Sequence, residues 1–273
     1  MRRKNDMVAA LFNHKGGVGK STTAVNLATG LALRGYKVLV VDMDAQQNAT
    51  DYLDMQTAAS DPTIYDVLFD GLDPHKAIYP TRIDGLFCLP SSDRMLNASL
   101  RLNQDQIAIP SARLYSAFKK YSLPQKYDYV FLDCPSDLEA VTANALNAAE
   151  HCIVPCFADR FSKSGLISVI RAIEKASENG CGTEVSLLGI LLCNFRGMTK
   201  TAKRNFEEIN TSLPDKTFQT VIRQSSAIPD SIEICKPVYL LPKSPAFEDY
   251  EKLTTEFLLR TNKVAPITKL VSG

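Results

Sequence analysis

Short apolar runs alternate along the chain with longer segments whose apolar residues recur at helical spacing. An apolar run at 8–12 leads into a glycine-rich loop, residues 22–34 follow a helical pattern, and a β-branched run occupies 37–41. Gly35 is expected to end the helix between the two runs. This order predicts a strand, a helix and a second strand, which is the first βαβ unit of a parallel sheet.

The alternation continues to the C-terminus without a sequence repeat. Further strands are expected at 129–132, 152–155, 185–193 and 218–222, with helices at 138–149, 164–177, 199–209 and 246–259. Two stretches, 54–82 and 91–126, are less periodic and are expected to form short surface helices and loops. The pattern predicts one domain over residues 1–273, of the α/β class: a mostly parallel twisted sheet with helices on both faces.

Composition narrows the classes of function. Hydrophobic residues make up 45% and charged residues 22%, as in ordinary globular proteins. The net charge of +1 requires that any nucleic-acid binding come from a local basic patch. The seven cysteines form no C-x-x-C pair, which argues against a disulfide framework or a zinc site. No signal peptide or membrane-spanning stretch is recognisable, so we expect a cytoplasmic protein without a membrane partner.

The loop after the first predicted strand has the chemistry of a phosphate-binding site. Residues 13–23 read Asn-His-Lys-Gly-Gly-Val-Gly-Lys-Ser-Thr-Thr. Glycines let backbone N–H groups approach phosphate oxygens at the positive end of the following helix. Lys20 is expected to reach the β- and γ-phosphates of ATP, and the Ser21 hydroxyl to ligate Mg²⁺. The strict P-loop pattern has glycine where this chain has His14, so the match is to a variant.

The loop sequence Lys-Gly-Gly-Val-Gly-Lys-Ser-Thr at 15–22 resembles the signature of the deviant Walker ATPases, which include the ParA-type partition ATPases, MinD and the nitrogenase iron protein. The resemblance covers most of the chain and implies a P-loop NTPase fold and a homodimer that sandwiches ATP. It also implies that Lys15 contacts the nucleotide of the partner subunit, so that hydrolysis depends on dimerisation. The nucleotide-binding residues expected in the loop are Lys15, Gly16, Gly17, Val18, Gly19, Lys20, Ser21 and Thr22.

Three carboxylates follow predicted strands. Residues 41–50 are similar to the family segment Val-Asp-Leu-Asp-Pro-Gln-Gly-Asn-Ala-Thr, which implies that Asp44 positions the attacking water and that Asp42 supports the Mg²⁺ shell. Ala45 replaces the usual proline. Asp133 follows the run at 129–132 and is the Walker B candidate for holding Mg²⁺. Ser136 stands where the family pattern Asp-x-Pro-Pro has its second proline.

Residues 191–196 resemble the family segment that contacts adenine. The amide of Asn194 can both donate and accept hydrogen bonds, which suits the edge of the base. The same residue could equally cap the end of the strand before it. Both interpretations of Asn194 remain open from the sequence.

The resemblance is closest to the ParA branch, whose members bind DNA non-specifically as ATP dimers and are released by a stimulating partner protein. A ParA-type ATPase would associate with the nucleoid in its ATP state. The chain begins almost at the phosphate loop, so we expect it to lack the N-terminal DNA-reading domain of longer plasmid versions. Candidate DNA contacts are Lys200, Lys203, Arg204 and Arg223.

A solvated helix face would explain the same basic residues. The family's Pro-Arg-Asn-Val-Arg stretch is also absent, because residues 223–227 read Arg-Gln-Ser-Ser-Ala.

Two other functions have different requirements. A MinD-like membrane-cycling ATPase needs a basic amphipathic C-terminal helix, whereas residues 261–273 are interrupted by Pro266. An iron–sulfur ATPase needs a second well-spaced cysteine beside Cys134. The favoured prediction is a Mg²⁺-dependent partition ATPase, and the alternatives are a MinD-like membrane-cycling ATPase and a ParA-like positioning ATPase that binds no DNA.

Overall fold

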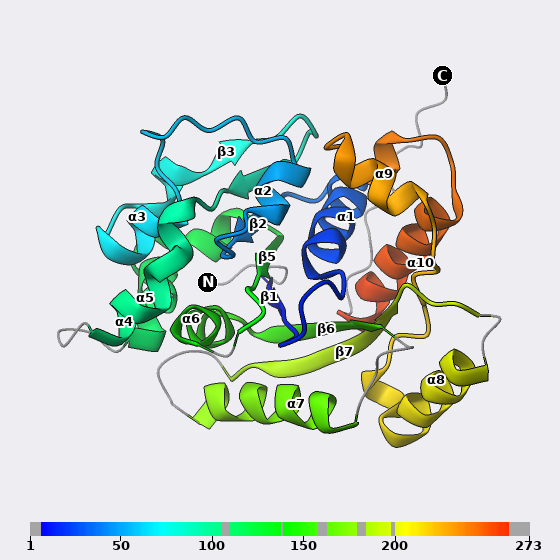
Figure 1. Ribbon diagram of the computed structural model, residues 1–273. Coiled ribbons are helices and arrows are strands. Elements are labelled where there is room, and N and C mark those ends of the chain that lie inside the picture. Colours follow the sequence, from blue (N-terminus) through cyan, green and yellow to red (C-terminus); the bar gives the residue numbers. More distant parts are fainter. Residues whose placement is uncertain are drawn as a thin grey trace.

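The strands form one mostly parallel sheet (Figure 1). The computed structural model describes residues 7–104, 110–137, 139–157, 163–178, 184–197 and 200–261. Within these ranges the sheet has the order β3-β4-β2-β5-β1-β6-β7, and β3 alone runs antiparallel to its neighbour. The strands are β1 (Met7–Leu11), β2 (Val38–Asp42), β3 (Tyr79–Pro80), β4 (Leu86–Leu89), β5 (Tyr129–Asp133), β6 (His151–Phe157) and β7 (Ser186–Cys193).

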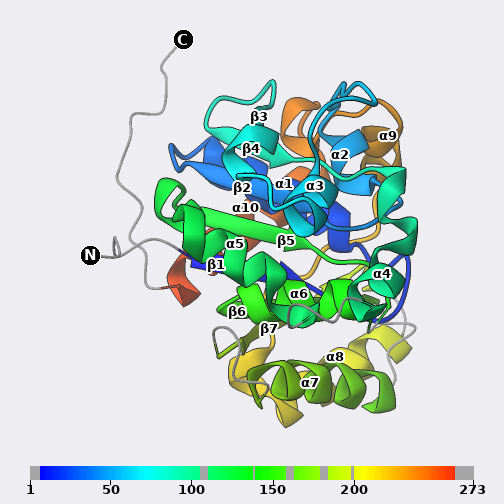
Figure 2. The ribbon, with the colours of Figure 1, turned by 90° about the vertical axis from the view of Figure 1, so that its left-hand side faces the viewer.

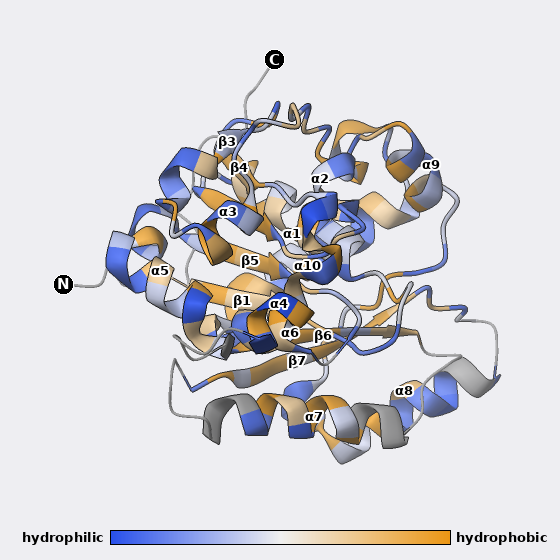
Figure 3. Ribbon diagram, turned by 60° about the vertical axis from the view of Figure 1, so that its left-hand side comes forward, coloured by the Kyte–Doolittle hydropathy of each residue, from blue (hydrophilic) through white to orange (hydrophobic). Residues whose placement is uncertain are grey.

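Both faces of the sheet are buried because helices cover each of them (Figure 2). Along β1, Met7, Ala9 and Leu11 point into one core, whereas Val8 and Ala10 point into the other. This period of two explains why the central strands read as continuous apolar runs. Figure 3 shows the strands as a hydrophobic layer between helices with mixed surfaces.

The helices divide between the two faces. The first core contains residues from α1 (Lys20–Ala32), α2 (Asn48–Tyr52) and α10 (Pro245–Arg260). The second contains residues from α3 (Ile64–Phe69), α4 (Ala98–Gln104), α5 (Arg113–Tyr121), α6 (Ala140–Ala148) and α7 (Lys163–Glu178). Ile209 of α8 (Lys200–Ser212) also belongs to the second core, and Ile228 of α9 (Ala227–Glu233) packs against the first. None of the helices in the described ranges is long and apolar enough to span a bilayer.

Most predicted elements are confirmed with ends shifted by a few residues, and Gly35 does follow α1, at φ 85°. Two strands were missed: β4, in the segment at 83–90 for which no element was expected, and the short β3, within the stretch 54–82 where helices and loops were expected. The prediction of a strand at 218–222 is wrong, because the described structure has only two isolated bridges next to this segment, between Thr217 and Ile190 of β7 and between Arg223 and Phe195.

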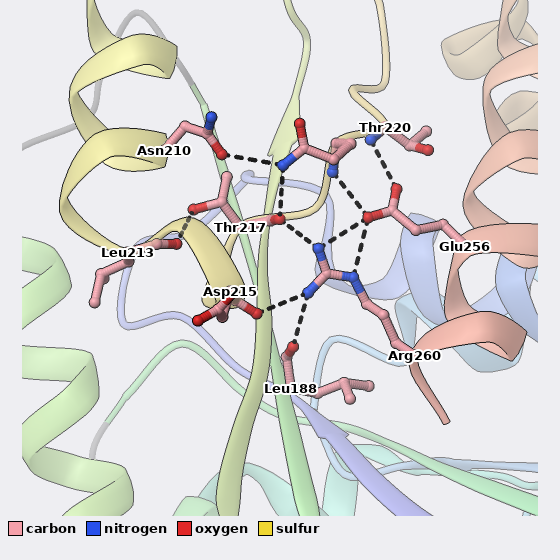
Figure 4. Close-up of polar contacts among 9 residues, drawn as sticks. Leu188, Asn210, Leu213, Asp215, Thr217, Thr220, Glu256 and Arg260 are labelled. Carbon is pink, nitrogen blue, oxygen red and sulfur yellow. Dashed lines mark hydrogen bonds and ion pairs between the residues drawn. The ribbon is translucent and has the colours of Figure 1, made fainter. Parts of the chain in front are cut away.

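The side chain of Glu256 explains why residues 218–222 do not form a strand. Phe218 and Ile222 donate backbone hydrogen bonds to the β7 carbonyls of Ile190 and Leu192. Between them, the N–H groups of Gln219 and Thr220 instead donate to the Glu256 carboxylate, both at 2.8 Å (Figure 4). A ladder with β7 would need the N–H of Thr220, which lies between these two donors, so its bond to the carboxylate interrupts the pairing.

Arg260 joins the end of α10 to the same edge of the sheet. Its guanidinium pairs with Glu256 at 2.9 Å and donates to the carbonyls of Leu188, Asp215 and Thr217 (Figure 4). The guanidinium also lies 4.4 Å from the centre of the Phe218 ring. This network anchors α10, β7 and the segment after α8 to one another.

Candidate ATP-binding site

The glycine-rich loop joins the end of β1 to the start of α1, at the carboxyl edge of the sheet. Gly17 and Gly19 have φ values of 69° and 93°, a region that side chains with a Cβ rarely adopt. Asn13 holds the start of the loop: its amide donates to the Pro155 carbonyl at 2.8 Å, and its oxygen accepts from Lys15 N at 3.1 Å. The sequence pattern did not single out Asn13, whose role depends on a contact with β6.

Lys20, the first residue of α1, points across the loop. Its side chain is 7% exposed, and Nζ donates to Ser136 Oγ at 2.7 Å. Ser136 follows β5, so the hydrogen bond joins the phosphate loop to the segment after the Walker B candidate. The sequence pattern did not reveal Ser136 as a site residue. The sequence did contain a signal for it. Where the family has its second proline, whose side chain has no hydrogen-bond donor, this chain has the hydroxyl of Ser136.

Asp133 ends β5 and is fully buried. In the sheet it is in register with Leu11 of β1 and with Asp42 of β2, so it lies beside the loop. Burial and the neighbouring Asp42 charge raise the pKa of Asp133 well above its usual range, whereas the nearby Ser21 hydroxyl and Lys20 ammonium lower it. Among the described residues, neither carboxylate oxygen of Asp133 has a hydrogen-bond partner.

An unpaired buried carboxylate is costly unless a cation or a proton balances it. The oxygens of Asp133 and Ser21 are the hard ligands that Mg²⁺ prefers, and bound phosphates complete such sites. The residues present therefore fit a Mg²⁺ ion shared with a nucleotide. No group of three or more His, Cys, Asp or Glu side chains in the described ranges would hold a metal without that nucleotide.

Asp42 braces the segment that carries Asp44. One of its oxygens accepts from Asp44 N at 3.1 Å, and the other accepts from Thr50 N and Thr50 Oγ1, both at 2.8 Å. Burial raises the pKa of Asp42 to about 6, although these hydrogen bonds lower it. The contacts support a positioning role, in which Asp42 acts through Asp44. The predicted support of the Mg²⁺ shell by Asp42 stays a prediction.

A cavity of about 510 Å³ lies against the loop, within the range of roughly 300–1,000 Å³ common for ligand pockets. It brings together predicted residues from three parts of the chain: Gly16, Gly17, Gly19, Lys20, Ser21, Thr22, Asp44 and Asn194. Asp44 is half-buried and accepts from Gln46 N at 3.0 Å. Val18 is buried outside this lining, and Asp133 and Asp42 lie behind it in the sheet.

The rest of the cavity lining is mostly apolar and was not predicted. The apolar and aromatic members of the lining are Tyr52, Phe157, Cys193, Ile222, Ile228, Pro229, Ile232 and Tyr250, and its further polar members are Gln46, Asn48 and Ser136. Asn194 adopts a left-handed conformation, φ 50°, at the end of β7. Apolar side chains beside the Asn194 amide fit a planar base, which favours the adenine interpretation of Asn194. The contact itself stays a prediction.

The remaining predicted residues lie outside the cavity. Lys15 is exposed at the tip of the loop and does not line the cavity of its own chain. Lys200, Lys203 and Arg204 are exposed on α8. Arg223 is held by carboxylates: its guanidinium lies 2.8 Å from Asp249 and 3.0 Å from Glu248, which raises the pKa of Arg223.

The cysteines give no support to a bridging cluster. Among the six cysteines in the described ranges none forms a disulfide, and Cys134 is fully buried. Burial raises the pKa of the Cys134 thiol well above its usual value, so it is a core residue and not an exposed thiolate. The C-terminal stretch considered for membrane binding lies, after Thr261, outside the described residues.

A glycine-rich loop between β1 and α1, a buried lysine at its end and an aspartate after a neighbouring parallel strand define a P-loop ATPase. Known proteins agree with this class. A family model described as an AAA domain matches residues 6–186. The sporulation initiation inhibitor protein Soj of Bacillus subtilis is 31% identical over 254 residues, covering 91% of this chain and 97% of Soj.

Other relatives are named as partition proteins. The chromosome partitioning protein ParA of Caulobacter vibrioides is 31% identical over 254 residues, covering 93% of this chain and 94% of ParA. Among solved structures, Cyanothece McdA with an Asp-to-Ala substitution, in complex with ATP, superposes with a TM-score of 0.83 at 22% identity, covering 97% and 98% of the two chains. A putative plasmid partition protein of Borrelia burgdorferi, bound to AMPPNP, gives 0.79 at 25% identity, covering 93% and 99%. The chain belongs to the AAA-domain family, in the group of the ParA and Soj partition ATPases.

Proposed function

We propose that the protein is an ATP-dependent dimerisation switch that partitions DNA or positions another cargo, with non-specific DNA binding in its ATP state. The observation that carries the proposal is the convergence of Lys20, Asp44 and Ser136 on one cavity, with a second lysine, Lys15, exposed next to the lining residue Gly16. An exposed lysine there can serve a second subunit, which suits a switch that assembles around its nucleotide.

The chain's own residues have separate roles in the proposed hydrolysis of ATP to ADP and phosphate. Lys20 neutralises charge on the β- and γ-phosphates, and Lys15 of the facing subunit adds a second positive charge. Asp44 orients the attacking water for in-line displacement. Ser21 and Asp133 would hold Mg²⁺, which when bound supplies Lewis-acid stabilisation of the phosphate oxygens.

The proposed DNA surface is α8. Lys200, Lys203 and Arg204 occupy positions i, i+3 and i+4 of this helix and are exposed, so their charges can reach a phosphate backbone together. We leave Arg223 out of this surface, because Asp249 and Glu248 already neutralise it. Dimerisation doubles the number of such charges on one particle, which would make DNA binding depend on ATP.

DNA binding is expected only with ATP and is expected to weaken steeply with salt. The measurement is binding of a random-sequence duplex across salt concentrations with ADP, with ATP, and with ATP and the Asp44→Ala variant. Neutralising all three α8 cations should lower the slope of log affinity against log salt by about one for each phosphate that is no longer neutralised. A matched control neutralises three exposed lysines on other elements, Lys76, Lys126 and Lys252.

The two arms of this experiment distinguish the candidate functions. An unchanged slope in the α8 variant, with a lower slope in the control, would move the DNA surface elsewhere. Absence of DNA binding in every nucleotide state, with ATP-dependent dimerisation intact, would leave a positioning ATPase anchored to a protein scaffold or a membrane.

Replacing Lys15 by alanine is expected to spare ATP binding and to remove the ATP-dependent dimer. The side chain lies outside its own cavity, so the effect falls on the facing subunit. ATP turnover should fall about 10²- to 10³-fold, the usual cost of removing one charge-stabilising donor. Sedimentation with ATP and a nucleotide titration measure the two effects, with His14→Ala as the matched loop control. A Lys15→Ala protein that still dimerises with ATP would disprove the trans role.

A further inference from the structure

The hydroxyl of Ser136 has an unused donor at the wall of the nucleotide cavity. It accepts a hydrogen bond from Lys20 Nζ at 2.7 Å, because an ammonium group can only donate. A serine hydroxyl carries a proton of its own in addition to the lone pairs that accept. Among the described residues that proton has no acceptor, and Ser136 is half-buried in the cavity lining. The hydroxyl can therefore donate to a bound ligand.

Ser136 Oγ lies against the start of the phosphate loop as well as beside Lys20. A Cβ atom placed on Gly16 would be 3.7 Å from this oxygen, which is an ordinary van der Waals distance. Gly16 and Lys20 bound the glycine-rich stretch of the loop. The hydroxyl is thus close to both ends of the stretch whose backbone N–H groups and lysine would hold phosphate oxygens.

The segment that carries Ser136 is held on both sides. Before it, Cys134 N donates to the Leu11 carbonyl of β1 at 3.3 Å. After it, the Asp137 carbonyl accepts from Thr142 Oγ1 of α6 at 2.7 Å, and Thr142 is buried. A hydroxyl on a segment that is already held needs little further ordering when a ligand binds, which lowers the entropic cost of the contact.

The strand order decides which end of a nucleotide meets Ser136. In the sheet, β6 and β7 lie on one side of β1, and β5 and β2 lie on the other (Figure 1). Phe157 and Cys193, which end β6 and β7, belong to the apolar part of the lining. Ser136 and Asp44 follow β5 and β2. A nucleotide whose base packs on the apolar part therefore crosses the loop with its phosphates and brings its γ-phosphate beside Ser136.

A γ-phosphate can satisfy both side chains at once. It has three non-bridging oxygens, so one can accept from the Lys20 ammonium while another accepts from the Ser136 hydroxyl. The hydroxyl would then accept from Lys20 and donate to the phosphate, which uses both of its hydrogen-bonding capacities. A hydrogen bond to an ionised acceptor is shorter and stronger than one between neutral groups.

We propose that the Ser136 hydroxyl donates to the γ-phosphate of ATP and makes the site prefer ATP over ADP. ADP has no group at that position, so with ADP the hydroxyl keeps only its bond from Lys20. The family pattern has proline here, which cannot make the contact. The inference rests on the proposed function only in taking ATP as the nucleotide, and it is independent of DNA binding and of dimerisation.

The test compares the affinity for AMPPNP, which retains the γ-phosphate of ATP, with the affinity for ADP. Both are measured with Mg²⁺ by isothermal titration. Ser136→Ala should weaken AMPPNP binding about tenfold or more, the usual effect of losing a hydrogen bond to a charged group, and should change ADP binding less than about threefold. A side chain that only held Lys20 in place would affect both nucleotides alike.

Three further variants make the comparison specific to the hydroxyl. Ser136→Thr retains a hydroxyl and should preserve the preference for AMPPNP. Ser136→Cys keeps the shape of the side chain with a weak donor and should lose most of that preference. Ser116→Ala removes an exposed hydroxyl from α5, outside the cavity lining, and is the matched control that should bind both nucleotides normally.

Dimerisation would also favour the triphosphate, so each titration is repeated with Lys15→Ala, for which the proposed function predicts no ATP dimer. The loss of preference in Ser136→Ala should be the same in both backgrounds. A loss confined to chains that retain Lys15 would show that Ser136 acts through the dimer and would overturn the assignment.

The failures of the two proposals are distinguishable. Equal weakening of AMPPNP and ADP in Ser136→Ala, or unchanged affinity for both, would overturn the assignment of Ser136 and leave the proposed function standing. Absence of binding of either nucleotide to the unmodified chain would overturn the proposed function as well.

Discussion

Replacing Lys20 by alanine is expected to abolish nucleotide binding at ordinary concentrations. The ammonium is nearly buried at the cavity wall, 2.7 Å from Ser136 Oγ, so it can contact phosphate oxygens with little competition from water. Removing one partner of a desolvated charge pair costs about 2–5 kcal/mol, or roughly 30- to 5,000-fold in affinity. Isothermal titration with ATP and ADP measures the change.

The fold should survive this substitution. Within the described ranges Lys20 forms no ion pair with a carboxylate of the sheet, and Ser136 faces the cavity, where water can replace the missing donor. Thermal unfolding of the nucleotide-free variant is the control for folding, and Lys15→Ala is the control within the same loop. ATP affinity in Lys20→Ala close to that of the unmodified chain would mean that the backbone cradle dominates binding.

Replacing Asp44 by alanine is expected to separate binding from turnover. Asp44 is half-buried in the cavity, and its carboxylate accepts a hydrogen bond from the backbone of its near neighbour Gln46, so its removal should leave the phosphate loop in place. Orientation of a water by a carboxylate contributes about 10²- to 10⁴-fold to rate. We expect turnover to fall by that factor while ATP affinity changes little, and the ATP dimer to persist.

Single-turnover phosphate release and sedimentation with ATP measure these effects. Asp51→Ala, which removes an exposed carboxylate from α2, is the matched control and should leave turnover unchanged. Asp42→Ala is an informative contrast, because it removes three hydrogen bonds that hold the segment and should also lower thermal stability. Rapid turnover by Asp44→Ala would show that another residue orients the water.

Local patterns in the sequence determined the central strands of the sheet, most of the longer helices and the phosphate loop. Buried parallel strands must be apolar on both faces, so β1, β2 and β5 are visible as uninterrupted apolar runs. The loop requires glycine at φ values of 69° and 93°, which makes it recognisable from its residues alone. The carboxyl edge of the sheet then places Asp133 beside that loop, as the order of strands and helices implies.

Contacts between residues far apart in the sequence decided the rest. Glu256 interrupts the strand expected at 218–222, and Asp249 neutralises an arginine that looked available for DNA. Ser136 became a site residue only when β5 placed it against Lys20. The apolar part of the cavity lining comes from several separate segments. Periodicity and motifs report local backbone preference, whereas side-chain pairing depends on which surfaces the fold brings together, and only the tertiary structure specifies that.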